Sequence, residues 1–566
     1  MSFDAPNFDF LLSLGIFALV MLGFFVLVIG LSMLGSFMSH GTGGFGVVMQ
    51  NFQRALIDFF SISPKRIGAI ADLTIKESIR KKTLLVFVIF AILFMFAGWF
   101  IGGTTDRPDL QVRVLVSFVL KTISWLVLIV IPLLACWGLP TDIKIRSLHT
   151  VITKPVRRNE VYLGRLLGYS AVGTGVLAIM GLVGYIWIVR QTPAAAQSEL
   201  ISRVPIYGAL SFSDRFGRSS EGQAGINVGY EWDFRSYIEG GTKSRTFYKF
   251  DALDINNLRN SYASRKAAYD KEAQANPETK TPEPSALNLE YNFEAFRAYK
   301  GTLDKRLSAR IVLVNPDDEK VRVPLPVFEV KEFSRFNEEK LIPVPEEITY
   351  RDEESQQLKT ANLFTDIMPK GNLKVEVECL DPGQYLGMAR PDLFIRMPDR
   401  YFATSYFKSI FGIWLQLTLM IMLAVTASCF VKGPVATLLT FSLVLVGMTP
   451  LSTMMFQMLQ GQIEGGGPAE AIYRMWAHMN PSVDIPAGAF SYFLKIIDGI
   501  ALGFLAVAFF IVPGFVNFRM VEYTANGFDV PWMSSLLPAI AITLGYVIPC
   551  LIIGYCSLTL REMEAK

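Results

Sequence analysis

The chain has 566 residues, of which 51% are hydrophobic and 18% are charged, and its formal net charge is +3. With a mean hydropathy of +0.37, this composition excludes an ordinary water-soluble protein, and the small net charge excludes the strongly basic surface that gathers nucleic acid. A helix that crosses a bilayer needs about 20 mostly apolar residues. Several stretches meet this requirement, so we expect an integral membrane protein.

The N-terminal region is predicted to contain one transmembrane helix followed by a helix at the membrane surface. Residues 10–38 are apolar, lack a basic start and are too long for a signal-peptide core, which indicates a retained helix in an extra N-terminal segment, 1–38. Residues 45–60 mix Arg54 and Asp58 with aromatic residues. That mixture is typical of an amphipathic helix that lies in the membrane interface.

A second amphipathic helix is predicted at residues 67–82. Isoleucine or alanine recurs there every four positions, opposite a charged face that includes Lys76, Glu77 and Arg80. This spacing indicates a helix that rests its apolar face on the membrane surface. Residues 39–83 are therefore interpreted as cytoplasmic interfacial, or elbow, helices.

The membrane segment 84–190 is predicted to contain three spans, at residues 84–104, 114–138 and 166–190. The last two spans are joined by a polar loop at 139–165. The segments 39–83 and 139–165 together contain 13 Lys and Arg against 5 Asp and Glu. An excess of this kind marks cytoplasmic loops, so we place both segments inside the cell.

The sidedness of the remaining chain follows from the number of spans. Residues 191–403 come after a span that leaves the cytoplasm, so we expect them to form an extracytoplasmic domain. Their many charges do not oppose this, because long domains cross the membrane largely regardless of charge. The same reasoning places the N-terminus outside and the C-terminus in the cytoplasm. The predicted location is the inner (plasma) membrane, which the chain crosses several times.

The C-terminal segment 404–566 is predicted to contain three more spans, at residues 408–431, 435–457 and 535–558. The first two are joined at Lys432-Gly433-Pro434, where Gly ends one helix and Pro starts the next. Residues 493–512 are also long enough to cross. We interpret them as re-entrant or interfacial, because Lys495 and Asp498 disfavour deep burial in lipid.

The extracytoplasmic domain is predicted to be rich in β-structure. Segments such as ARIVLVNP and LKVEVECLDPG alternate apolar and polar residues and end at Pro, Asp or Gly, which indicates antiparallel strands. A β-sandwich is the natural arrangement. Residues 253–306 interrupt this pattern with a charged, helix-prone stretch, which we interpret as a helical insertion. The predicted fold is therefore a polytopic α-helical membrane protein of about seven transmembrane helices, with an inserted, mainly-β, sandwich-like α+β domain.

No catalytic, metal or cofactor site is predicted in this chain. His40, His149 and His478 have no metal-ligand spacing, Cys379 is the only cysteine in the polar middle, and neither CxxC nor HExxH occurs. The phosphate-binding motif GxxxxGK[ST] and the hydrolase motif GxSxG are also absent from the sequence. We therefore do not expect an enzyme, and we do not expect this chain to hydrolyse nucleotide.

The loop LPTDIKIRSLHTVITKPVRRNEVYLGR at 139–165 resembles the membrane subunits of ABC transporters of the ABC-2 exporter type. In that family a span is followed by an acidic residue, a Thr-Leu pair, a KPV-R-x-E turn and Gly-Lys. Ser147 stands here where Thr is usual, and Arg165 replaces the common Lys. The helix that ends in KESIRKK and the C-terminal LTLREME also resemble the elbow helix and the charged C-terminus of the family.

The resemblance implies a permease that couples ATP hydrolysis by a separate cytoplasmic ATPase to the outward movement of a substrate, possibly amphipathic or lipid-linked. It also implies a dimer with a second permease chain, homomeric or related, with membrane lipid as a further partner and no nucleic acid. ATP and Mg would be bound by the partner ATPase, and this chain would hold no cofactor. The residues implied at the ATPase interface are Asp142, Arg146, Leu148, Val151, Lys154, Pro155, Arg157, Arg158 and Glu160.

Two other functions fit the same sequence. In the first, the ATPase works or regulates the extracytoplasmic domain mechanically, and no solute crosses. In the second, the chain is a passive membrane scaffold that displays a binding domain. The basic loop would then only orient the protein in the bilayer.

Lys121 is the one intramembrane cation that we consider as a contact site. It lies about 10 Å inside the predicted span 114–138, counted from its outer end at about 1.5 Å a residue. A lysine at this depth extends its ammonium to the interface, or it contacts an anionic headgroup or a transport pathway.

Overall fold

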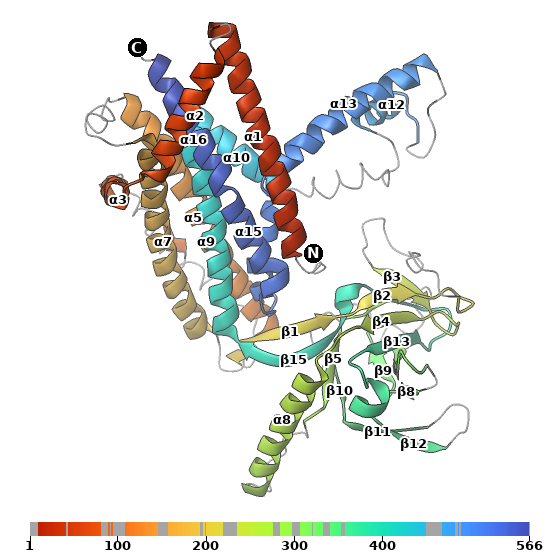
Figure 1. Ribbon diagram of the computed structural model, residues 1–566. Helices are drawn as coiled ribbons and strands as arrows, with labels where there is room; N and C mark the ends of the chain where they lie inside the picture. The colour runs from red at the N-terminus through yellow and green to blue at the C-terminus, as the bar shows by residue number, and fades with distance from the viewer. Residues whose placement is uncertain are drawn as a thin grey trace.

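The computed structural model of the protein describes residues 9–40, 44–80, 86, 89–90, 92–93, 108–144, 157–192, 196–197, 200–218, 235–275, 284–296, 306–319, 321–331, 340–351, 357–448, 467–480, 485 and 488–564. Figure 1 shows a bundle of long helices with a β-rich domain at one end. Most of the predicted span 84–104 and residues 449–457 of the span 435–457 lie outside the described residues.

Five helical segments are long and apolar enough to cross a membrane among the described residues. They are Phe10–Met38, Gln111–Asp142, Arg158–Gln191, Phe402–Phe430 and Trp532–Thr559. The helices of the bundle and its surroundings are α1 (Phe10–His40), α2 (Gly44–Phe60), α3 (Pro64–Arg80), α5 (Pro108–Lys144), α7 (Arg158–Gln191), α9 (Phe402–Phe430), α10 (Gly433–Met448), α12 (Pro468–Trp476), α13 (Ala489–Ile511), α14 (Met520–Ala525), α15 (Leu537–Gly545) and α16 (Val547–Glu564). The prediction of a helical membrane protein agrees with these segments.

The centre of the bundle is formed by α5, α7 and α9, which pack against one another, with α16 against α7 and α9. Fully buried apolar side chains fill the space between them, including Leu120, Ile131, Leu177 and Met180. α5 continues through Pro132 and Pro140. Proline is tolerated in spanning helices because neighbouring groups satisfy the freed carbonyls.

The predicted loop 139–165 is helical at both ends, which differs from the prediction. α5 continues to Lys144 and α7 already begins at Arg158. Charged residues at these helix ends suggested a loop, but their side chains are paired with other helices, so the helices extend further than hydropathy indicates. Residues 145–156 lie outside the described part of the chain.

The β-rich domain contains four antiparallel sheets among its described residues. The strand orders are β1-β15-β5-β10, β2-β4-β13-β7-β8 with β9 also on β7, β3-β14-β6, and the hairpin β11-β12. The strands are β1 (Ile201–Tyr207), β2 (Ala209–Phe212), β3 (Ser236–Glu239), β4 (Thr246–Phe250), β5 (Leu287–Tyr291), β6 (Glu294–Phe296), β7 (Leu307–Val314), β8 (Arg322–Pro324), β9 (Phe328–Val330), β10 (Leu341–Val344), β11 (Glu347–Arg351), β12 (Leu358–Asn362), β13 (Leu373–Cys379), β14 (Tyr385–Met388) and β15 (Leu393–Tyr401).

One apolar core joins all four sheets, because Tyr248, Leu289, Leu386 and Ile348, each from a different sheet, belong to the same buried cluster. The mainly-β character agrees with the prediction, although the described strands form four sheets and not the two of a simple sandwich. Within the predicted helical insertion 253–306, the structure describes residues 253–275, 284–296 and 306, and of these Ile255–Ala275 form the helix α8. The second part of the insertion contributes β5 and β6.

The β-rich domain is continuous with the bundle through two neighbouring strands. β1 follows α7 in the chain, β15 runs directly into α9, and β1 pairs with β15 from Ile201–Tyr401 to Tyr207–Phe394. The link before the last span also lies on this strand pair, since the backbone N–H of Arg203 donates to the carbonyl of Gly527 at 2.9 Å.

Charged side chains reinforce this connection. The carboxylate of Asp529 accepts hydrogen bonds from Lys408 of α9 and from Arg400 of β15, each at 2.8 Å. We call Asp529, Lys408 and Arg400 the Asp529 cluster. The Asp529 cluster therefore ties α9 and the link before the last span to a strand of the domain.

α12 and α13 form an arm that extends sideways from the bundle (Figure 1). The Asp498 carboxylate of α13 accepts hydrogen bonds from the backbone N–H groups of Ala469 and Glu470, at 2.5 and 3.1 Å, and so caps the N-terminus of α12. Asp498 is therefore not an isolated charge, which removes one of the two reasons for interpreting 493–512 as re-entrant. The re-entrant placement stays a prediction.

Candidate functional site at the α3–α7 junction

The described residues of the predicted ATPase interface lie where α5 ends and α7 begins. Asp142 is in the last turn of α5, Arg157 precedes α7, and Arg158 and Glu160 are in its first turn. These positions lie at the end of the bundle remote from the β-rich domain (Figure 1). Arg146, Leu148, Val151, Lys154 and Pro155 lie outside the described residues.

α3 packs closely along the first half of α7. A Cβ atom at Gly164 would lie 2.6 Å from Cβ of Ile70, and one at Gly168 would lie 2.5 Å from Cβ of Thr74. Both distances are far below van der Waals contact, so glycine is needed at these two positions for the helices to approach. The amphipathic helix predicted from the sequence thus packs against a membrane helix through one face, with Ile67 and Ile70 buried.

An ion-pair cluster around Arg165 joins three helices at this contact. The Arg165 guanidinium of α7 donates to Glu77 of α3 at 2.6 Å and also to the carboxylate of Asp142 of α5. The Arg165 side chain is only 7% exposed and that of Asp142 only 11%. We call Arg165, Glu77 and Asp142 the Arg165 cluster; it fixes α3 to both membrane helices.

Glu160 caps two helices with one carboxylate. Its Oε1 accepts the backbone N–H of Ser63, immediately before α3, at 2.9 Å, and its Oε2 accepts the backbone N–H of Arg157, immediately before α7, at 3.0 Å. A carboxylate at a helix N-terminus satisfies orphan N–H groups and complements the helix dipole. The side chain is 0% exposed and lies 3.6 Å from Arg66.

Glu160 has a structural role within the chain. Its carboxylate is fully buried and accepts two backbone N–H groups, so its contacts hold the starts of α3 and α7. Asp142, only 11% exposed and paired with Arg165, is in the same position. Both residues position helix ends, whereas Arg157 and Arg158 are partly exposed. A contact of these residues with an ATPase stays a prediction.

Arg157 extends the junction to α2 and α16. Its guanidinium donates to the carbonyl of Ile57 at 2.8 Å and lies 3.5 Å from the carboxylate of Asp58. The same carboxylate accepts the hydroxyl of Tyr555 at 3.0 Å. The end of α2, the start of α7 and the last helix are therefore held together.

The remaining charged residues of the elbow helix lie on the exposed face of α3. Lys76 pairs with Asp72 at 2.6 Å, four residues earlier, and both side chains are more than half exposed. Arg80 is exposed as well, whereas Glu77 belongs to the Arg165 cluster. Lys76 and Arg80 therefore face away from the bundle, where membrane headgroups or a partner can reach them.

Lys121 lies on an exposed face of α5, together with Trp125 and Ile129, which are 64% and 42% exposed. These residues are four positions apart and so lie on one face of the helix, which no other described part of the chain covers. The position is compatible with a lysine that extends to the interface and with contact to an anionic group.

The described contacts of the junction hold its helix ends against one another. Its described carboxylates are occupied by arginines or by backbone N–H groups. Removing one partner of a buried ion pair costs about 3–5 kcal/mol, which applies to the pair of Arg165 with Asp142. The contacts of Arg157 and Asp58 are more exposed and add α2 and α16 to the same group of helices. No group of three or more His, Cys, Asp or Glu able to hold a metal ion occurs among the described residues.

Comparison with protein-family models, with curated proteins and with solved structures gives no match.

Proposed function

We propose that the chain is the membrane subunit of an ATP-driven exporter of the ABC-2 type, worked by a separate cytoplasmic ATPase. The observation that carries the proposal is the junction of α3 with α5 and α7. At this junction the amphipathic helix α3 is held against the spans α5 and α7, beside the charged connection between them. The contacts are the Arg165 cluster and the caps made by Glu160.

The proposed coupling needs stiff helix ends at α5 and α7. A push on the connection between α5 and α7 is transmitted to both helices only if their ends do not yield. The Arg165 cluster and Glu160 hold both ends against α3. Arg157 and Arg158 supply partly exposed cations beside this rigid base, and such cations pair with carboxylates across a protein interface.

The proposed sidedness places this junction in the cytoplasm and the β-rich domain outside. What supports it is the excess of 13 Lys and Arg over 5 Asp and Glu in the two segments that meet at the junction. The β-rich domain lies at the opposite end of the bundle (Figure 1).

Purification from native membranes tests the proposal. The tagged wild-type chain should elute with ATP hydrolysis that vanadate inhibits, because its ATPase partner stays bound. Reversing the charge in Arg158→Glu should reduce this hydrolysis by about tenfold, the loss expected for one charged contact. Lys271→Glu, on α8 at the far end of the protein, is the matched control. Hydrolysis that is absent from the wild type, or equal in both variants, would oppose the proposal.

A second candidate function is mechanical, in which the ATPase works the β-rich domain and no solute crosses. The observation that favours it is the direct continuity of β15 with α9 together with the Asp529 cluster. These contacts pass movement of the spans to the domain without a flexible linker.

Energy transfer between fluorophores tests the mechanical function. One label is placed at Lys271→Cys on α8 and the other at Leu438→Cys on the exposed side of α10. The mechanical function predicts that ATP changes the transfer efficiency, and that Asp529→Asn reduces the change. Transport that proceeds with unchanged transfer efficiency would favour a simple exporter.

A further inference from the structure

The β-rich domain contains a pocket that neither the membrane assignment nor the proposed coupling explains. It lies between α8 and the link that joins β10 to β11, and its volume is about 280 Å³. In Figure 1, α8 projects from the side of the domain that faces away from the bundle. Any ligand of this pocket therefore comes from the compartment of the β-rich domain.

The fold builds the pocket. α8 is anchored by Leu258 and Tyr262, which are 6% exposed, and the Tyr262 ring lies 6.5 Å from the ring of Phe364. Further along the same helix the pocket is lined by Ala263 and Ala267, whose small side chains leave the space open. The anchored ring forms one wall, and the link between β10 and β11 forms the other.

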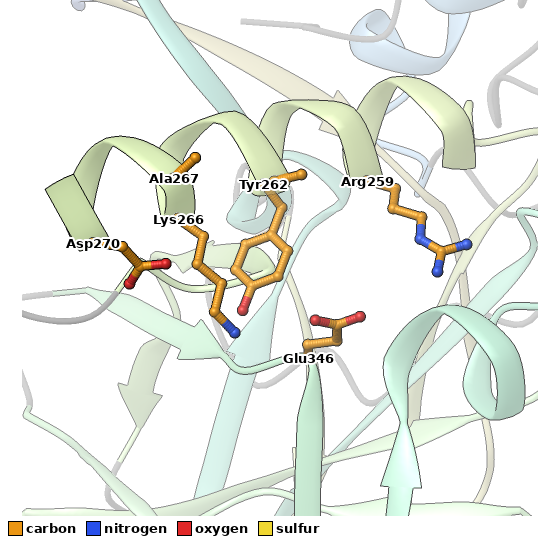
Figure 2. A pocket seen from close by; sticks show the side chains of 7 residues that line it. Arg259, Tyr262, Lys266, Ala267, Asp270 and Glu346 are labelled. Atoms are coloured by element: carbon orange, nitrogen blue, oxygen red, sulfur yellow. The ribbon is translucent and has the colours of Figure 1, made fainter.

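The pocket carries four charged side chains of balanced sign, Arg259, Lys266, Asp270 and Glu346. Lys266 and Asp270 are four residues apart on α8, a spacing at which opposite charges are neighbours, and the Lys266 ammonium lies 5.6 Å from the centre of the Tyr262 ring. Figure 2 shows Arg259 and Lys266 on either side of the Glu346 carboxylate.

The side chains of Arg259 and Glu346 both line the pocket but form no ion pair with each other. Within the part of the chain that the structure describes, no ion pair or side-chain hydrogen bond is formed by either residue. A guanidinium is matched in shape to a carboxylate, which it binds through two parallel N–H groups. A lone carboxylate accepts hydrogen bonds from an ammonium group.

We propose that this pocket binds a small zwitterion, an α-amino acid or a dipeptide, with the ligand carboxylate on Arg259 and the ligand ammonium on Glu346. Size limits the ligand, because 280 Å³ is just below the ~300 Å³ at which pockets for drug-sized ligands begin. The balanced charge of the lining disfavours a simple anion or a simple cation.

Calorimetric titration of the full-length chain in lipid nanodiscs tests the proposal. The probes are the standard amino acids, the dipeptides Ala-Ala and Gly-Gly, and the same compounds with an acetylated amine or an amidated carboxylate. At least one uncapped probe should bind at one site per chain. Arg259→Gln and Glu346→Gln should each weaken that binding by about tenfold or more, since each removes a charged hydrogen-bonding partner.

The capped probes identify the contact of each residue. Acetylating the amine should remove the effect of Glu346→Gln, and amidating the carboxylate should remove the effect of Arg259→Gln. Arg306→Gln, which opens an exposed ion pair with Glu329 in the same domain, should leave binding unchanged. The proposal is overturned if no probe binds below about 10 mM, or if binding is insensitive to both pocket substitutions. Whether amino acids or dipeptides bind more tightly distinguishes the two sources of the ligand.

Discussion

Among the single charged residues of the junction, we expect Arg165 to have the largest effect on stability. Its loss removes the guanidinium that pairs with the Asp142 and Glu77 carboxylates in a largely buried position. Breaking a buried ion pair from one side costs about 3–5 kcal/mol. We predict that Arg165→Met lowers the free energy of unfolding by about this amount in detergent, measured by chemical denaturation.

Lys76→Met provides the control for Arg165→Met. It removes an ion pair between two side chains that are 70% and 59% exposed, and exposed pairs contribute about 0–1 kcal/mol. Equal destabilisation by the two substitutions would show that the Arg165 cluster does not hold the junction together.

Cys379 allows a separate test of the β-rich core. The thiol is buried, and burial raises its pKa from 9.0 to about 11. At pH 8 only about one thiol in a thousand is then ionised, and the thiolate is the reactive form. We predict that a variant in which Cys379 is the only cysteine resists maleimide at pH 8 until it is unfolded.

The raised pKa of Cys379 also sets the direction of a pH effect. The thiol of the unfolded chain ionises near 9.0 and that of the folded chain near 11, so the folded state loses stability as the pH rises through this interval. Rapid labelling of the native protein at pH 8 would contradict the burial of this residue.

At the scale of elements, the contact between α3 and α7 depends on two glycines. A leucine at Gly168 would collide with Thr74, and α3 would have to move away from α7. We predict that Gly168→Leu destabilises the protein and lowers the ATP hydrolysis that elutes with it. Gly175→Leu is the control on the same helix, because nothing lies within 4 Å of a Cβ atom placed there. Identical behaviour of the two variants would exclude a role for the close contact.

The sequence predicts an element well where a long apolar run or a regular alternation of apolar and polar residues defines it. Apolar length places α1, α9 and the last span, and alternation places β7 and β13, because hydropathy and side-chain direction determine these elements locally. Strand pairing is different, since β15 pairs with β1 across almost the whole domain. Such long-range partners leave no local pattern.

The sequence indicates where the charged helix ends of the candidate site lie, but it does not indicate which side chains pair there. The basic pattern of residues 139–165 points to these helix ends but predicts a loop, whereas both helices extend into it and Arg165 pairs with Asp142 and Glu77. The cap of α7 by Glu160 has a local signal, since Glu at the third helical position fits a capping box. Its contact with Ser63, 97 residues away, has none. The contact of Asp58 with Tyr555 joins residues 497 positions apart and has none.

In the whole molecule, the proposed topology places the two ends of the bundle in different compartments. We predict that an impermeant maleimide added to intact cells labels Lys271→Cys on α8 and leaves Arg80→Cys on α3 unlabelled, in a background without other cysteines. In inside-out vesicles the labelling should reverse. Labelling of both positions from one side would contradict the topology.

The most direct measurement is photo-crosslinking from the connection between α5 and α7. A photoreactive amino acid is placed at Leu148, or at Lys271 as the control, and the membranes are labelled with a photoreactive ATP analogue. We predict that Leu148 forms an adduct with a protein that carries the nucleotide label, and that Lys271 does not. An adduct at Leu148 that never carries the nucleotide label, or no adduct at all, would contradict the coupling of this chain to a cytoplasmic ATPase.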